Sequence, residues 1–263
     1  MANSKISFLI ATYKDPTFTK QCIDSIFLKC DVVKSKNEII VYEDGSDYDD
    51  FNNIKNFCEK HKHRKYIKFI YDRSNNGIGF AMNRLVKEAN NDMCIRIDSD
   101  VEFVIKNFDD KLISFLEKDK TLGLITCRTE TIGQPLQRVK IPDYFIETNI
   151  EEEYMNSLDV PILTYCSEPN EVLSGFCFAF RKSNIIENDI RFCTEMKMYG
   201  EDGIFHFDIL NAGFKAAIAN KLYMWHKHHG TVGNIDEGLV TIERKKALEV
   251  WTEYLQKGKE KIN

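Results

Sequence analysis

The sequence has no apolar run that approaches the roughly 18 residues of a membrane-spanning helix. Its first residues also lack the charged and then apolar layout of a signal peptide. Basic charge is not in excess either, because 36 lysines and arginines face 41 aspartates and glutamates, and the net charge of -5 argues against a protein built wholly around nucleic acid. We therefore expect a cytoplasmic globular protein without a transmembrane segment, whose contact with a membrane, if any, is peripheral.

Paired cysteines are absent as well. The eight cysteines fall singly, mostly within apolar stretches, and no Cys-x-x-Cys pair occurs. A zinc site or a redox pair needs such spacing, and a disulfide frame is typical of short secreted chains. We expect these cysteines to be buried, reduced thiols. At 263 residues with 43% hydrophobic residues, the chain is long enough for one large α/β domain.

One stretch carries the clearest chemical signal. Within residues 93–103, a mostly apolar run of strand length leads into Asp98-Ser99-Asp100. Alternate residues of an extended chain point the same way, so the two aspartates can share one target at the edge where open α/β sheets bind ligands. Paired carboxylates suit a divalent cation that also contacts substrate phosphate. From this tripeptide alone, the alternative is a strand followed by a solvated acidic turn.

The first half of the chain alternates strand and helix patterns. Short apolar runs predict strands, and apolar residues repeated every three or four positions predict helices between them. Four strands separated by helices imply a parallel sheet with right-handed crossovers, whose carboxyl edge gathers the polar motifs. The expected strands are 6–11, 38–43, 66–71 and 93–98, and the expected helices cover about 18–30, 48–62 and 78–89.

Two more strand ends and one helix start carry polar groups. The first strand runs into Ala11-Thr12-Tyr13-Lys14-Asp15-Pro16, which offers an aromatic face and polar tips for a nucleotide base. The second runs into Glu43-Asp44-Gly45-Ser46-Asp47. Asn75-Asn76-Gly77-Ile78-Gly79 opens a helix, where free backbone N–H groups favour a phosphate, although the full dinucleotide-binding spacing is absent. Taken singly, the two strand ends are also explained as turns with a helix cap.

The joint order of four motifs resembles the nucleotide-sugar half of the family 2 glycosyltransferases with the GT-A fold. The motifs are Ile-Ser-Phe-Leu-Ile-Ala-Thr-Tyr, Val-Tyr-Glu-Asp-Gly-Ser, Asn-Asn-Gly-Ile-Gly-Phe-Ala-Met-Asn and Asp-Ser-Asp, within roughly the first 105 residues. The resemblance implies a nucleoside diphosphate sugar as donor and Mn²⁺ or Mg²⁺ as cofactor. The sequence departs from the family pattern at Glu43, where an aspartate is usual, and at Arg84 and Leu85, where small residues are often seen.

The same resemblance assigns roles to residues. It implies that Ala11, Tyr13 and Asp44 hold the base, that Asp98 lies near the ribose and the metal, and that Asp100 ligates a cation bridging the diphosphate. The full set of donor-binding residues expected on this basis is Ala11, Thr12, Tyr13, Glu43, Asp44, Asn76, Gly77, Asn83, Asp98 and Ser99.

The second half of the chain is less regular. Helical periodicity covers 107–118, and apolar runs predict strands at 122–127 and 173–181. Gly175 in the last of these permits the close approach of a ligand or another backbone. Between 128 and 170 there is no clean period, which is typical of a functional loop or of elements that periodicity does not reveal.

A second chemical centre is Gly200-Glu201-Asp202. An apolar pattern follows it, which places both acids in the first turn of a helix. Acids there complement the helix dipole, which is the purely structural explanation. The functional hypothesis is that one acid is a general base for an acceptor hydroxyl. The motif also resembles the acceptor-side motif of the same family, which implies Asp202 as the base and Glu201 as an acceptor contact.

Three of the six histidines cluster near the end of the chain, at His226, His228 and His229. A surface loop can carry such a cluster without function, but histidine is a common metal ligand. The resemblance implies that a histidine from this region completes the metal site, and we favour His226, with His228 in reserve. The tail at 236–263 predicts one long helix with a basic, solvated end.

We therefore expect a single GT-A domain over 1–263, a Rossmann-like and mostly parallel sheet flanked by helices. Its parts are a nucleotide-sugar half (1–105), an irregular acceptor-side half (106–235) and the C-terminal helix. The expected activity is metal-dependent transfer of a sugar, with inversion and with UDP sugars favoured, to a hydroxyl of a glycan, lipid-linked, protein or nucleic-acid-base acceptor.

Two alternatives belong to other classes. A non-catalytic nucleotide-sugar-binding protein needs no base. A nucleotidyltransferase of related fold is expected to carry an early Gly-rich phosphate loop, which 11–16 is not.

Overall fold

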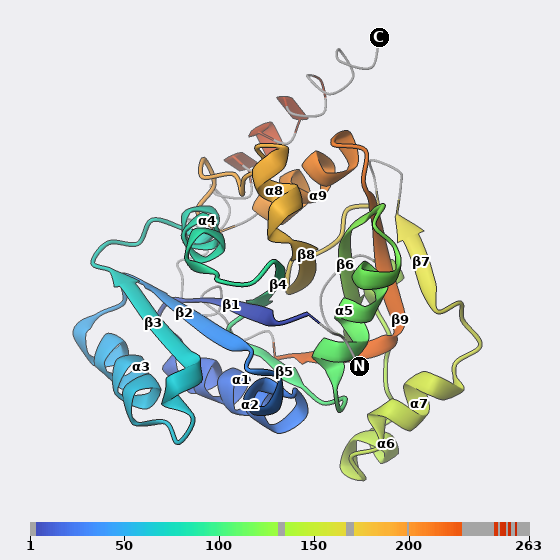
Figure 1. Cartoon of the computed structure of the whole chain (residues 1–263), viewed down its shortest axis with the longest axis horizontal. Coiled ribbons are helices and arrows are strands. Elements are labelled where there is room, and N and C mark those ends of the chain that lie inside the picture. The colour runs from blue at the N-terminus through green and yellow to red at the C-terminus, as the bar shows by residue number, and fades with distance from the viewer. Residues whose placement is uncertain are drawn as a thin grey trace.

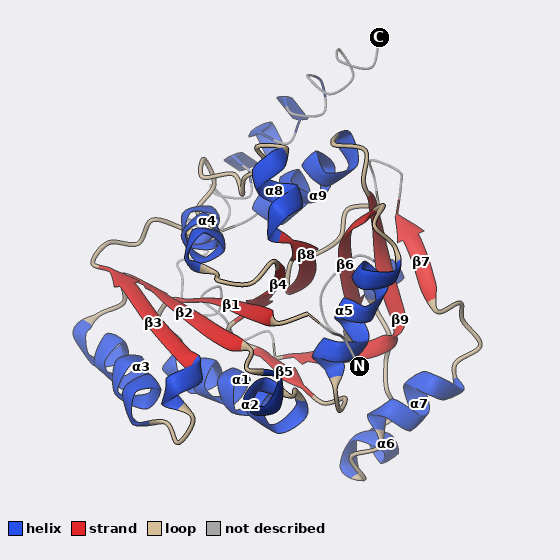
Figure 2. Ribbon diagram, in the orientation of Figure 1, coloured by secondary structure: helices blue, strands red, loops and turns tan. Residues whose placement is uncertain are grey.

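The computed structural model describes residues 4–130, 135–166, 171–198 and 200–227, together with 245–246, 248–250, 252–253 and 256. Over these ranges nine strands form one curved, mixed sheet with helices on both faces (Figure 1). Figure 2 shows the same elements by type, with the sheet running through the middle of the molecule between two groups of helices.

The first four strands are parallel and form one side of the sheet. β1 (Ile6–Thr12) lies between β2 (Glu38–Asp44) and β4 (Met93–Asp98), and β3 (Ile67–Asp72) is the outer strand. All four expected strands are present, and their ends differ from the predicted ones by one residue at most. The helical segments that connect them are α1 (Pro16–Lys29), α2 (Val32–Ser35), α3 (Tyr48–Lys60), η1 (Arg64–Tyr66) and α4 (Ile78–Glu88).

Local sequence signals start two of these helices. Pro16 lies in the first turn of α1, where its missing N–H costs nothing, and the Asp15 carboxylate accepts a hydrogen bond from the Phe18 backbone N at 3.2 Å. Asp47 caps α3 in the same way, accepting from the Asp50 backbone N at 3.1 Å. Both caps lie just beyond a strand end, so the chain turns sharply there and gathers its polar groups at one edge of the sheet.

The rest of the sheet is mixed. β8 (Cys177–Arg181) runs antiparallel to β4, and β6 (Leu122–Arg128) runs antiparallel to β8. β9 (Lys215–His226) pairs with β6, with β7 (Leu163–Cys166) and with β5 (Val101–Phe103). The strand order is β3-β2-β1-β4-β8-β6-β9-β5, with β7 beside β9. The expected α/β class is confirmed.

β9 is the main element that the sequence pattern does not predict. It is twelve residues long and mostly buried, but Asn220 and Lys221 interrupt its apolar run. The interruption is tolerated because the Asn220 side chain is satisfied: Oδ1 accepts from Arg128 Nη2 at 2.7 Å, and Nδ2 donates to the Pro161 carbonyl at 2.9 Å. These partners are distant in sequence, so a local pattern cannot reveal them.

The aperiodic segment also contains short elements. Within 128–170 the described residues form η2 (Pro135–Gln137), α6 (Asp143–Glu147), α7 (Glu151–Ser157) and β7. None is longer than seven residues, which is too short for a helical or alternating period to stand out. The strand expected at 173–181 begins four residues later, at Cys177.

Two hydrophobic clusters fill the two faces of the sheet. One lies under α1, α3 and α5 (Phe108–Lys118), and the other under α4, α8 (Lys182–Glu187) and α9 (Glu201–Asn211). Successive residues of β4 alternate between them, since Ile95 and Ile97 belong to the first cluster and Cys94 to the second. Arg96 therefore points to the same face as Cys94, towards α9.

All eight cysteines are free thiols, as expected. Seven are buried and Cys193 is partly exposed.

The described residues of the expected C-terminal helix, from 245 to 256, are helical. The remainder of 236–263, together with His228 and His229, lies outside the described residues. In the described part of the chain, no helix combines the length and the apolar character that crossing a bilayer requires.

A buried polar pair ties α5 to the sheet. The Asn37 amide accepts a hydrogen bond from the Ile6 backbone N at 2.9 Å and donates one to Asp109 Oδ2 at 3.2 Å. Asp109 is fully buried in the first turn of α5. Burial raises the pKa of its carboxyl from 3.8 to about 6.

Asp109→Asn should make the free energy of unfolding less dependent on pH. Because the folded-state pKa of Asp109 lies above the unfolded value, its stabilising effect is fully present below about pH 4 and is lost as the pH rises through about 6. A shift of about two units corresponds to about 3 kcal/mol. Urea unfolding of wild type and variant at several pH values between about 4 and 8 measures the free energy of unfolding of each. The variant should become more stable relative to wild type as the pH rises. The neighbouring Asp110→Asn is the control, and an equal effect of both variants would contradict the assignment.

Candidate functional site

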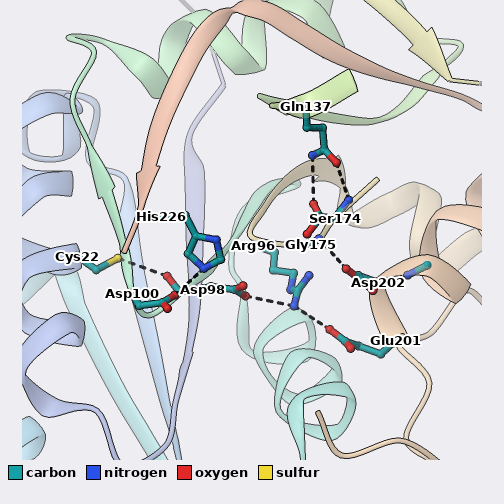
Figure 3. Close-up of polar contacts among 11 residues, drawn as sticks. Cys22, Arg96, Asp98, Asp100, Gln137, Ser174, Gly175, Glu201, Asp202 and His226 are labelled. Atoms are coloured by element: carbon teal, nitrogen blue, oxygen red, sulfur yellow. Dashed lines mark hydrogen bonds and ion pairs between the residues drawn. The ribbon is translucent and has the colours of Figure 1, made fainter. Parts of the chain in front are cut away.

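Three potential metal ligands meet at the carboxyl edge of β4. Asp98 is the last residue of that strand, and Asp100 follows just before β5. β5 pairs with the end of β9 in an antiparallel register that sets Val101 opposite His226. His226 Nε2–H therefore donates a hydrogen bond to Asp100 Oδ1 at 3.0 Å (Figure 3). The ligand atoms of Asp98, Asp100 and His226 all lie within 4.8 Å of one another.

The cluster is largely shielded from solvent. Asp100 is 6% and His226 is 8% exposed, whereas the Asp98 side chain keeps 31% of its surface open. The Phe176 ring stacks on the His226 ring with the centroids 5.7 Å apart. Burial alone would lower the pKa of His226, but the hydrogen bond to Asp100 and the charges of Asp100 and Asp98 outweigh burial and raise it. A proton and a cation would therefore compete for this imidazole.

The donor set fits a divalent cation. Two carboxylates and one imidazole are the oxygen and nitrogen ligands that Mn²⁺ takes, and carboxylates also suit Mg²⁺. Asp98 opens the cluster on one side, where substrate oxygens and water can complete the coordination sphere. The structure brings together Asp98, Asp100 and His226, the three residues expected from the sequence as metal ligands, and their role as ligands stays a prediction.

The second predicted centre lies across Arg96 from this cluster. Gly200, with φ 89°, caps α9, and Glu201 and Asp202 form its first turn. Glu201 is 3% exposed and its Oε1 accepts from Arg96 Nη2 at 2.8 Å, so it is not placed to contact an acceptor. Asp202 is partly exposed, and its carboxylate accepts from the Gly175 and Gly203 backbone N, each at 2.8 Å.

Burial also changes the acidity of this centre. Burial and the charge of Asp202 raise the pKa of Glu201 to about 8, although Arg96 opposes the shift. The two adjacent acids therefore have different environments, because only Asp202 reaches solvent.

Asp44, expected from the sequence to hold the base, is hydrogen-bonded to the turn that starts α4 (Ile78–Glu88). Its two carboxylate oxygens accept from the Asn76 and Gly77 backbone N at 2.9 and 2.8 Å. Burial raises the pKa of Asp44 to about 6. Gly77 has φ +91°, and a Cβ on it would lie 2.8 Å from the Lys197 Cα, so only glycine fits this start of α4.

Other predicted donor-binding side chains are engaged within the protein. The Thr12 hydroxyl is hydrogen-bonded to the Thr19 hydroxyl at 2.7 Å, and Glu43 Oε1 accepts from the Ser46 backbone N at 2.7 Å. The Asn83 amide makes a double hydrogen bond to the Phe192 backbone, at 2.8 and 2.9 Å. These three side chains are therefore hydrogen-bonded to the protein itself. Ala11, Tyr13 and Ser99 are partly exposed at the same edge as Asp98.

One functional residue is missing from the sequence-based set. Arg96 is 3% exposed and links the two centres, since its Nη2 also lies 3.3 Å from Asp98 Oδ1. The available signal is a charged residue in the middle of an otherwise apolar strand, and a buried charge always needs a partner. The partner itself, Glu201, cannot be read from local sequence.

The chain matches the family model described as glycosyl transferase family 2 over residues 7–187, which includes β1 to α8 and both aspartates of the metal cluster. The chain belongs to glycosyl transferase family 2. The expected family and the glycosyltransferase class of enzyme are thereby confirmed. The match ends before α9 and β9, which supply Asp202 and His226. No curated protein matches the chain.

Solved glycosyltransferase structures share the fold, which confirms the GT-A expectation. TarS of S. aureus is 19% identical with a TM-score of 0.60, over 84% of this chain and 36% of TarS. The mannosyltransferase PcManGT of Pyrobaculum calidifontis, in complex with GDP-Man and Mn²⁺, is 16% identical with a TM-score of 0.64, over 89% and 60%. GalNAc-T7 with UDP, GalNAc and Mn²⁺ is 15% identical with a TM-score of 0.65, over 85% and 44%. The chain spans less than two thirds of each.

Asp100→Asn should lower the affinity for Mn²⁺ by more than about 100-fold. Loss of a residue that only orients a metal ligand costs about 10- to 100-fold, and loss of a ligand's charge should cost more. The substitution keeps the shape of the side chain but removes its charge. Electron paramagnetic resonance of free Mn²⁺, titrated with protein in the presence of UDP, measures the affinity. Asp189→Ala, whose side chain is 80% exposed, is the control. Equal affinity of Asp100→Asn and wild type would remove Asp100 from the metal site.

Proposed function

We propose that the protein transfers a sugar from a nucleoside diphosphate sugar to an acceptor hydroxyl in a single displacement with inversion. The observation that carries the proposal is the Asp98–Asp100–His226 cluster, which lies where an open α/β sheet holds a nucleotide. The Mn²⁺ and nucleotide complexes of PcManGT and GalNAc-T7, which share the fold, support a cation and a nucleotide donor here.

Asp98, Asp100 and His226 are the residues that we propose to hold Mn²⁺ or Mg²⁺. When bound, such a cation offsets the negative charge that develops on the leaving diphosphate. The open side of Asp98 faces the edge that carries Ala11, Tyr13 and Ser99 and, on the next strand, Asp44, which would receive the nucleoside.

We propose Asp202 as the general base. It is the partly exposed acid of its pair, and the two backbone N–H groups that donate to it fix its orientation while leaving lone pairs for a proton. It comes from α9, whereas the proposed metal ligands come from the end of β4, the turn before β5 and the end of β9 (Figure 3). An in-line displacement needs the base and the leaving group on opposite sides of the sugar carbon, and we propose that the sugar lies between Asp202 and these ligands. Glu201 is buried against Arg96, so in this proposal it orients the first turn of α9 and does not contact the acceptor.

We also propose a uracil-type base as the preferred one. Asp44 is held rigidly by the Asn76 and Gly77 backbone and still has lone pairs that can accept the N3–H of a pyrimidine. A site built for one hydrogen bond strongly penalises a base that cannot make it.

Asp202→Asn should slow transfer by roughly 100-fold or more and leave donor affinity nearly unchanged, because it removes the basic lone pair and keeps the shape. Initial rates and melting temperature are measured on the same preparation. Asp208→Asn, further along α9 and also partly exposed, is the matched control. If Asp202 were only a helix-terminus acid, the variant would lose about 0.3 to 1 kcal/mol of stability and keep its turnover.

UDP and dTDP sugars should bind at least about tenfold more tightly than GDP or ADP sugars in the presence of Mn²⁺. Calorimetric titration with each nucleotide, followed by a screen for Mn²⁺-dependent hydrolysis of the matching sugars, measures both preference and turnover. Thermal stabilisation without hydrolysis or transfer would indicate a binding protein. Equal or tighter binding of a purine nucleotide would overturn the role of Asp44.

A further inference from the structure

Arg96 is a cation buried in the middle of a strand. It is 3% exposed, and its guanidinium lies between the Phe178 and Phe192 rings, 5.6 and 5.9 Å from their centroids. Desolvating a charge is unfavourable, so such a residue persists only where its partners compensate. Burial alone would lower the pKa of Arg96, but the charges of Asp98, Glu201 and Asp202 outweigh burial and raise it, which keeps the guanidinium charged.

The partners of Arg96 belong to the two centres of the site. Nη2 donates to Glu201 Oε1 at 2.8 Å on α9 and lies 3.3 Å from Asp98 Oδ1 at the end of β4 (Figure 3). The same nitrogen makes both contacts, so the position of Nη2 sets where the two carboxylates lie relative to each other. One side chain thus joins the metal cluster to the helix that carries Asp202.

A second contact leads from Arg96 to Asp202. Gly175 packs against both, because a Cβ on Gly175 would overlap Arg96 Nη1 and would lie 2.7 Å from the Asp202 Cβ. The Gly175 backbone N donates to Asp202 Oδ2 at 2.8 Å. The preceding residue, Ser174, is held by Gln137, whose Oε1 accepts from the Ser174 backbone N at 2.8 Å. Gly175 therefore fits closely between the guanidinium and the carboxylate.

We infer that Arg96 is a positioning residue that sets where the Asp202 carboxylate lies relative to the Asp98–Asp100–His226 cluster, acting through Glu201 and through Gly175. The inference rests on the proposed function for its catalytic meaning. The link between the residues rests on the contacts alone.

The other buried arginine of the sheet shows what a purely structural role looks like. Arg181 is 5% exposed at the far end of β8, and its guanidinium donates to the backbone carbonyls of Leu122, Leu116 and Asp119. It joins α5 to β6 and contacts no residue of the site. Arg96 differs because carboxylates of the two centres take the place of those carbonyls.

The first experiment compares Arg96→Lys with Arg181→Lys. Lysine keeps a charge at each position, but at position 96 it lacks the second nitrogen, Nη1, that packs against Gly175. With Mn²⁺ and the nucleotide sugar that gives the highest hydrolysis rate, Arg96→Lys should lower kcat and kcat/KM together by about 30-fold or more. The KM for the donor should stay within about threefold of wild type. Arg181→Lys should lower the melting temperature and leave both kinetic constants nearly unchanged.

The second experiment needs no donor. Backbone hydrogen exchange of the free protein reports the hydrogen bond from Gly175 N to Asp202 directly, because an amide exchanges when its bond opens. Arg96→Lys should speed exchange at Gly175 and in the first turn of α9 by about tenfold or more, and Arg181→Lys should not. This result stands even if no nucleotide sugar is a substrate, so failure of the proposed function is distinguishable from failure of the positioning role.

Gly175→Ala tests the same contact from the other side. The added methyl group must displace the guanidinium or Asp202, so it should reproduce the kinetic and exchange effects of Arg96→Lys without changing any charge. Gly123→Ala is the matched control, since a Cβ there would lie 2.5 Å from the Phe214 Cβ, away from the site. If Arg96→Lys and Gly175→Ala keep wild-type kcat and wild-type exchange at Gly175, Arg96 has no positioning role. If both control variants show the same losses, the effect is general destabilisation and the inference is wrong.

Discussion

The antiparallel pairing of β5 with the end of β9 is the interaction on which the candidate site depends. Asp100 and His226 are 126 positions apart in the chain, and this short ladder is what brings them together. A slip of one residue would turn His226 to the opposite face of the strand. The Lys227 backbone N, which donates to the Asp100 carbonyl at 3.0 Å, extends the pairing beyond β5. The positions of Asp98, Asp100 and His226 are thus set by strand pairing on both sides of the short turn that carries Asp100.

The balance of charge explains what such a site can accept. Asp98, Asp100, Glu201 and Asp202 lie around Arg96 and His226 in a mostly buried volume, so carboxyl groups outnumber cationic side chains there. A bare phosphate would be repelled by that excess, whereas a divalent cation would be attracted. The proposed diphosphate donor would therefore bind together with a cation.

The first half of the fold could be predicted from the sequence because its signals are local. The strand patterns and the two-residue spacing of Asp98 and Asp100 need no distant partner to be interpreted. β9 and the roles of Arg96 and Asp44 could not be predicted, since each depends on groups far away in the chain: Asn220 on Pro161, Arg96 on Glu201, and Asp44 on the Asn76–Gly77 backbone. The resemblance to a family supplied residue types for the site, but it could not show which carboxylate oxygens are already occupied.

The contact between Gly175 and Arg96 has a consequence for how sequences of this family can diverge. The space that a side chain at 175 would occupy is filled by the guanidinium at 96. A relative with a larger residue at position 175 must therefore carry a shorter one at position 96, and the two positions must change together. A single substitution at either one passes through an intermediate with a steric clash or an unpaired Glu201.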